Sequence, residues 1–151
     1  MQKQQKTSRA FLFLLFIAGT LQSTPLEAES LDDILVFVNP SNSIRKLSVA
    51  EVRQIFLKEK TKWSTGNNIL CIHPPQNVGL RNQFRSQVLD MTQEEEDTYW
   101  QDKKIRDNLS PPVSLGNTYR AVFSLREGIS YGYRKDVPRS AVKIVLVIPA
   151  H

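Results

Sequence analysis

Short runs of consecutive apolar residues alternate along the chain with segments in which apolar residues recur every three or four positions. Residues 34–38, 69–72 and 142–148 are runs of the first kind. Such runs are typical of strands that are covered on both faces, as in a parallel sheet. Shorter runs at 113–115 and 129–133 complete a set of five candidate strands.

Four segments between these runs have the apolar spacing of an amphipathic helix. The clearest covers residues 48–58, and the others cover residues 78–89, a polar stretch after Thr92, and part of residues 117–128. The order of elements is then β-α-β-α-α-β-α-β-β. Strands that alternate with helices predict an α/β domain with a mostly parallel sheet flanked by helices.

Two of the expected helices begin with a capping signal. Ser48 stands three residues before Glu51, and Thr92 stands three residues before Glu95. In this pattern the hydroxyl and the carboxylate each accept a hydrogen bond from the other residue's backbone N–H, which satisfies two donors at the helix start. We therefore expect helices to begin at these two positions.

The first 28 residues have the features of a secretory signal peptide. Residues 1–9 contain three basic residues and no acidic one, residues 10–21 are a run of mostly apolar residues, and a polar stretch then ends at Ala28. The apolar run is shorter than the roughly 20 residues that cross a bilayer. We predict a signal peptide at 1–28, one domain at 29–151 and a periplasmic location. The absence of Cys near the cleavage site disfavours a lipoprotein, and an uncleaved anchoring helix is the alternative.

The net charge changes once this segment is set aside. The whole chain carries +5, but residues 1–28 contain three bases and one acid, so the remaining 123 residues carry +3. Such a small excess is not typical of a nucleic-acid-binding protein. The longest acidic run, residues 94–97, predicts a solvated helix face rather than a metal site.

The sequence contains few of the groups that catalysis or metal binding requires. Its single cysteine, Cys71, excludes a disulfide within one chain and a Cys-only zinc site, and we expect it in the core. The two histidines, His73 and His151, offer little for a metal. His73 is expected to be a locally hydrogen-bonded loop residue, because no partner nucleophile accompanies it. We therefore expect neither an enzyme nor a bound metal or cofactor.

One loop and the helix after it have features of an anion-binding site. The helix expected at 78–89 would present unpaired N–H groups at its start, Gly79 would let an anion approach them, and Arg81 could add a guanidinium fork. The loop after the first strand follows the carboxyl end of another strand of the expected parallel sheet, so its serines could contribute hydroxyl groups. A plain helix cap with surface arginines would account for the same pattern. The candidate ligand-binding residues are Ser41, Ser43, Gln76, Asn77, Gly79 and Arg81.

One segment resembles a known family. Residues 47–57 follow the pattern Leu-Ser-x-x-Glu-(Leu/Val)-x-x-Ile-Phe, and residues 60–66 add a basic stretch with Trp-x-x-Gly. This is similar to the phosphate-type substrate-binding proteins of ABC transporters, which have the type II periplasmic-binding-protein-like fold. Further matches occur in order at Arg81, Phe84, Trp100 and residues 129–131.

The resemblance implies one lobe of a type II periplasmic binding protein that binds phosphate or a related small oxyanion. It also implies that the partners are ABC transporter membrane subunits or another periplasmic protein. The chain departs from the family at residues 75–81, where Gly79 and Arg81 are kept but the family's hydroxyl donors are missing. This departure supports an alternative function, a degenerate lobe that acts as a periplasmic protein-interaction or regulatory module.

Overall fold

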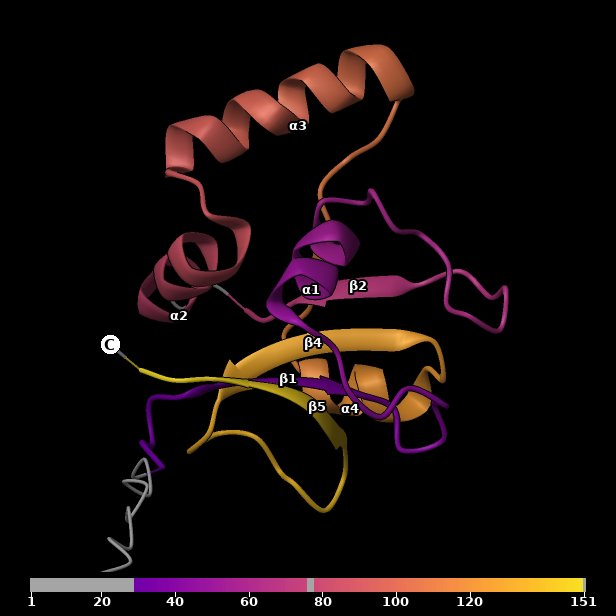
Figure 1. Cartoon of the computed structure of the whole chain (residues 1–151), viewed down its shortest axis with the longest axis vertical. Helices are drawn as coiled ribbons and strands as arrows, with labels where there is room; N and C mark the ends of the chain where they lie inside the picture. Colours follow the sequence, from indigo (N-terminus) through magenta and orange to yellow (C-terminus); the bar gives the residue numbers. More distant parts are fainter. Residues whose placement is uncertain (1–28, 76–77, 151) are drawn as a thin grey trace, which may run out of the picture.

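The computed structural model describes residues 29–75 and 78–150, so the predicted signal peptide lies outside the described residues. The described chain forms a five-stranded sheet in the order β3-β2-β4-β1-β5 (Figure 1). All five strands predicted from the sequence are present, with ends that differ by at most one residue. They are β1 (Ile34–Val38), β2 (Leu70–His73), β3 (Val113–Ser114), β4 (Gly128–Tyr133) and β5 (Lys143–Ile148).

Four of the five strands run in the same direction. Strand β2 pairs in parallel with both β3 and β4, whereas β1 pairs antiparallel with both β4 and β5. The predicted α/β fold with a mostly parallel sheet is confirmed in this sense, and β1 is the exception. Since β1 runs against β2, the carboxyl ends of these two strands lie at opposite edges of the sheet.

Helices cover both faces of the sheet. On one face α1 (Val49–Phe56) and α2 (Val78–Phe84) pack against the core, and α3 (Gln93–Asp107) lies beyond them, furthest from the sheet (Figure 1). On the other face α4 (Thr118–Ser124) covers a smaller cluster that includes Val122 and Phe37. Alternate residues of β1 face the two clusters, which explains why this strand is an unbroken apolar run.

The helix predicted at residues 78–89 is present, but its last five residues are not α-helical. Helix α2 continues directly into a π-helical turn, η1 (Arg85–Leu89), which ends at Asp90 in the left-handed conformation with φ of 52°. A π-helical turn is wider than an α-helical turn and is often found at functional sites. Here it follows Arg81 and contains Arg85, the two cationic residues of the site described below.

Both predicted capping boxes are confirmed. The Ser48 hydroxyl accepts a hydrogen bond from Glu51 N at 3.2 Å, and Glu51 Oε2 accepts one from Ser48 N at 3.0 Å. The bonds that its carboxylate accepts from Ser48 lower the pKa of Glu51. Thr92 and Glu95 make the corresponding pair at the start of α3, with distances of 3.2 and 2.7 Å.

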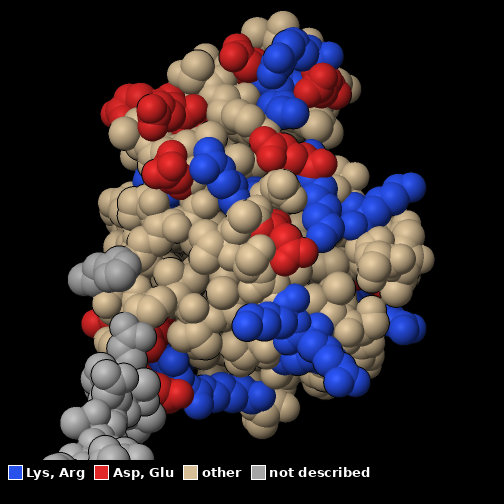
Figure 2. All heavy atoms as spheres, viewed as in Figure 1, with Lys and Arg blue, Asp and Glu red and all other residues tan. Residues whose placement is uncertain are grey.

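Helix α3 is strongly polar, with acidic residues in its first turn and basic residues in its last turn. This arrangement complements the helix dipole. Figure 2 shows acidic and basic side chains close together over α3, at the top of the view, whereas Lys and Arg gather on the lower part of the same face. Within the described residues, no helix is both long enough and apolar enough to cross a membrane.

Cys71 packs against the main core, as expected, although it is only partly buried. Its Sγ donates to the carbonyl of Ile55 at 3.3 Å, and burial raises the pKa of the thiol to about 12. The thiol is therefore protonated and unreactive at neutral pH.

Candidate functional site

A cavity of about 390 Å³ lies beside the carboxyl end of β2. Its lining comes from the end of β2, from α2 and η1, from the start of α3 and from the connection that leads into β3. Two arginines and four prolines dominate this lining. The lining residues are His73, Pro74, Pro75, Val78, Arg81, Asn82, Arg85, Gln93, Pro111, Pro112 and Ser114.

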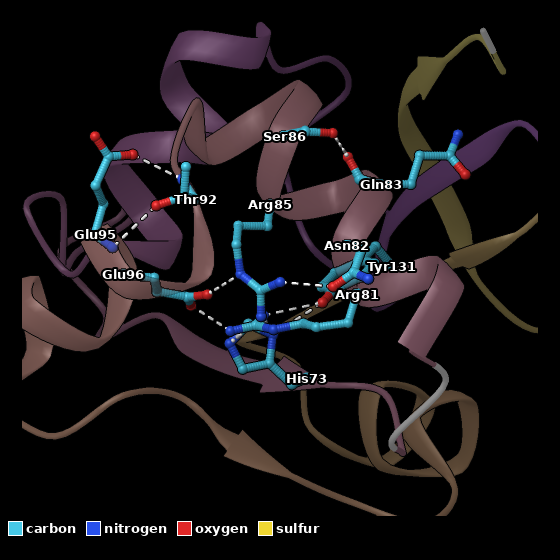
Figure 3. Close-up of polar contacts among 10 residues, drawn as sticks. All are labelled: His73, Arg81, Asn82, Gln83, Arg85, Ser86, Thr92, Glu95, Glu96 and Tyr131. Carbon is cyan, nitrogen blue, oxygen red and sulfur yellow. Dashed lines mark hydrogen bonds and ion pairs between the residues drawn. The ribbon is translucent and has the colours of Figure 1, made fainter.

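The two arginines share a single carboxylate. Arg81 from α2 and Arg85 from η1 both point toward Glu96 of α3 (Figure 3). The Arg81 Nη2 group donates to Glu96 Oε1, and Arg85 Nε donates to Glu96 Oε2 at 2.7 Å. Arg85 Nη1 also donates to Asn82 Oδ1 at 2.7 Å. The side chain of Glu96 is 5% exposed and that of Arg85 is 12% exposed, so this ion pair is largely withdrawn from water.

Arg81 also contacts two neutral groups below the ion pair. Its Nη1 atom lies 2.7 Å from His73 Nδ1 and donates to the Tyr131 hydroxyl at 3.1 Å. Burial, together with the charges of Arg81 and Arg85, lowers the pKa of His73 to about 2, so the imidazole is neutral at neutral pH. Burial raises the pKa of Tyr131 to about 12, which keeps its hydroxyl protonated. His73 is the buried last residue of β2 and not the loop residue that the sequence suggested.

The described ionisable groups of this cluster therefore carry one excess positive charge. Two guanidinium groups face one carboxylate, and His73 and Tyr131 contribute no charge. Charge interactions are stronger in such a partly buried site than in water. The arrangement is electrostatically suited to a small anion at the cavity wall.

The structure brings only some of the predicted ligand-binding residues to this cavity. Arg81 lines it, and Gly79 is exposed in the first turn of α2, one residue after the cavity residue Val78. Gln76 and Asn77 lie outside the described residues.

The two predicted serines lie at the opposite edge of the sheet. Ser41 and Ser43 follow the carboxyl end of β1, which pairs with the beginning of β4 through Val38 and Ile129. Their neighbour Asn42 donates to the carbonyl of Arg126, which precedes β4. The expected convergence of the two loops required parallel strands, and β1 is antiparallel. The structure therefore does not bring these serines to the cavity.

Glu96 is a residue of this site that the sequence pattern did not predict. The acidic run at 94–97 was expected to be a solvated helix face, and its other three members are exposed, but Glu96 is only 4% exposed. A signal was available, because Glu96 precedes the buried Trp100 by four residues and therefore shares its helix face. Arg85 also belongs to the site, and its spacing of four from Arg81 was visible in the sequence.

Residues Gly128–Gly132 have the pattern Gly-x-Ser-x-Gly, so the expectation that the sequence contains no such nucleophile-elbow pattern is wrong. In α/β-hydrolases this pattern places an exposed nucleophile at a turn between a strand and a helix. Here Ser130 lies in the middle of β4, is fully buried, and donates to the carbonyl of Ile72 at 2.7 Å. This serine is therefore not accessible to a substrate.

No group of three or more His, Cys, Asp and Glu side chains that could hold a metal ion occurs in residues 29–75 and 78–150. The charged residues of the cavity lining are Arg81 and Arg85, and the carboxylate of Glu96 is already bonded to both of them. The cavity is therefore better suited to an anion than to a cation.

Comparisons with known proteins show the fold. No protein-family model matches the sequence, and no curated protein matches it. The structure is similar to that of a Clostridium perfringens protein with bound phosphate, which is described as a phosphate ABC transporter substrate-binding protein. The TM-score is 0.58 and the sequence identity is 18%. The structure is also similar to an ABC-type phosphate transport receptor from Vibrio cholerae (TM-score 0.58, 16% identity) and to PstS from Borrelia burgdorferi (TM-score 0.56, 15% identity).

The similar region covers 76%, 78% and 76% of this chain, but only 45%, 47% and 46% of those three proteins. The chain thus spans about half the length of the structures that it resembles. The family resemblance noted in the sequence is confirmed at the level of the fold. The first of these proteins is named a substrate-binding protein and the second a transport receptor.

Proposed function

We propose that this protein binds a small oxyanion such as phosphate in the cavity beside β2 and catalyses no reaction. The observation that carries the proposal is the pairing of Arg81 and Arg85 with the single carboxylate of Glu96, which leaves one positive charge uncompensated. Guanidinium groups suit phosphate because their N–H groups can pair with two oxygens at once. Asn82, Gln93 and Ser114 line the same cavity and add polar groups.

The biological setting is also a proposal. Residues 1–28 have the features of a signal peptide, and the fold is shared with proteins named for phosphate ABC transport. We propose an exported, periplasmic protein that assists ABC-type uptake and contacts the transporter's membrane subunits or another periplasmic protein. Fractionation of cells that express the full chain, with N-terminal sequencing of the product, tests export and cleavage near residue 28.

Calorimetry with inorganic phosphate tests the binding site. Replacing Arg85 by Gln leaves the Arg81–Glu96 pair electrically balanced, so we expect phosphate affinity to fall about tenfold or more. Replacing Glu96 by Gln removes the internal competitor for both arginines, so we expect phosphate to bind more tightly. Opposite effects of two charge changes at one cluster would not arise from general destabilisation.

Arg53→Gln is the matched control, because Arg53 is a half-exposed arginine of α1 that pairs with Asp90 and does not line the cavity. We expect it to leave phosphate affinity unchanged. Absence of both binding heat and thermal stabilisation at millimolar phosphate would contradict the proposal, because a ligand that binds the native state must stabilise it.

A protein-interaction module is the second candidate function. It is favoured by apolar side chains that the described fold leaves exposed on the α4 side, since Val113 is 61% and Phe123 is 58% exposed. Val113 pairs with Ile72 in parallel and therefore shares the sheet face that α4 covers. A second copy of this chain is the proposed occupant. Light scattering should then show a dimer that Phe123→Ser weakens, and a wild-type monomer at high concentration would exclude it.

A further inference from the structure

The cavity is larger and more apolar than a bare tetrahedral oxyanion requires. Its volume of about 390 Å³ lies within the range of roughly 300–1,000 Å³ that holds small organic molecules. Phosphate is five heavy atoms, and contact with Arg81 and Arg85 would occupy only the charged wall. The remaining wall must therefore face either water or another part of the ligand.

Prolines and one valine make up most of that remaining wall, beside the polar residues Asn82, Gln93 and Ser114. Pro74 and Pro75 come from the connection after β2, and Pro111 and Pro112 come from the connection before β3. These connections line the same cavity because β3 is only two residues long and pairs with the last two residues of β2, so the residues just before β3 also lie near the carboxyl end of β2. A proline ring carries no N–H group, so this wall offers apolar contact where an oxyanion would need donors.

Val78 extends the apolar wall and is poorly covered by the protein. Its side chain lines the cavity, yet it is 71% exposed. Covering an exposed apolar side chain is favourable in proportion to the area removed from water. The proline rings have little conformational freedom to lose on binding, so such contacts carry a small entropic penalty.

We propose that the ligand is an organic phosphonate or phosphate monoester with a compact apolar substituent. This inference rests on the oxyanion site proposed above. The phosphoryl oxygens of this ligand bind at Arg81 and Arg85, and its substituent lies against Val78 and the two proline pairs. The charged group supplies orientation, and the apolar group supplies the additional affinity that separates this ligand from inorganic phosphate.

Calorimetry on the full protein with three probes tests this inference: inorganic phosphate, methylphosphonate and phenylphosphonate. We expect phenylphosphonate to bind about tenfold or more tightly than either of the others, because the phenyl ring covers apolar wall that the smaller probes leave in water. Phosphate affinity equal to or greater than phenylphosphonate affinity would overturn the inference and leave the oxyanion site standing. No binding of any probe would instead overturn the proposed function itself.

Two variants locate the apolar contact. Val78→Ser should reduce the advantage of phenylphosphonate over methylphosphonate several-fold. Val49→Ser is the matched control, because Val49 is also an exposed valine at the first position of a helix but does not line the cavity. An equal loss of phenylphosphonate affinity in both variants, or no loss in Val78→Ser, would overturn the assigned contact.

Discussion

The loops after β1 and β2 look alike in sequence but differ in what their polar groups do. Each follows a strand of the sheet and contains proline with asparagine. After β1, the Asn39 amide donates to the carbonyls of Val122 and Phe123, and the Asn42 amide donates to that of Arg126. After β2, the chain leads into a cavity whose arginines hold an excess positive charge.

The difference shows that a polar loop after a strand has at least two uses. The polar side chains after β1 satisfy backbone groups of the protein, as buried polar groups generally must. Those around the cavity form a charged cluster that is not neutralised within itself. Distinguishing the two requires the partners of each side chain, which the loop composition does not reveal.

Among substitutions that test this comparison, the largest change in the free energy of unfolding is expected at Glu96. Glu96→Ala leaves two partly buried arginines without their carboxylate, and we expect the free energy of unfolding to fall by about 3 kcal/mol. Urea denaturation measures this change. Glu94→Ala removes an exposed carboxylate from the same helical turn and should cost less than about 0.5 kcal/mol. Equal effects of the two variants would show that Glu96 is not the anchor of the cluster.

At the opposite edge the largest expected effect is at Asn39. This residue is buried and its side chain bonds to Val122 O at 2.9 Å, Phe123 O at 2.6 Å and Ser41 N at 2.8 Å. Asn39→Ala should lower the free energy of unfolding by about 2 kcal/mol, because buried carbonyls lose their donor, without changing phosphate affinity. Asn67→Ala, at an exposed asparagine bonded to Glu127, is the control and should have little effect on stability.

Acid should lower the free energy of unfolding through His73, which lies at the edge of the cavity. Its pKa is lowered from about 6.5 when unfolded to about 2 when folded, so below pH 6.5 the unfolded state binds a proton that the folded state rejects. His73 therefore stabilises the fold least at low pH, and stability should fall by about 1.4 kcal/mol per pH unit between pH 6.5 and 4.5. Lowered carboxyl pKa values, as at Asp33, act at lower pH. A flat stability profile between pH 7 and 5, or an equally steep one in His73→Gln, would contradict this prediction.

The smallest expected effect is at the two serines after β1. Ser41 and Ser43 are exposed, lie at the edge opposite the cavity and are not among its lining residues. Replacing both by Ala should change stability by less than about 0.5 kcal/mol and leave phosphate affinity within twofold. A tenfold loss of phosphate affinity would place the anion site at their edge instead.

Most of the local structure follows from short stretches of the sequence. The unbroken apolar run at Ile34–Val38 requires a strand covered on both faces, and the Ser48–Glu51 and Thr92–Glu95 pairs determine where two helices begin. These features depend on residues close together in the chain, so periodicity and capping chemistry were sufficient to predict them. The choice of Arg81 as a cavity residue followed from the same local reasoning.

Which of these elements meet depends on long-range pairing and packing. The direction of β1 depends on its pairing with β4 and β5, which lie about a hundred residues away, and this direction separates Ser41 and Ser43 from Arg81. The burial of Glu96 likewise depends on how α3 packs over α2 and η1, where one carboxylate meets two arginines. Contacts between segments far apart in sequence set these positions. The spacing of Glu96 from Trp100 indicates a shared helix face, but it does not indicate which residues that face meets.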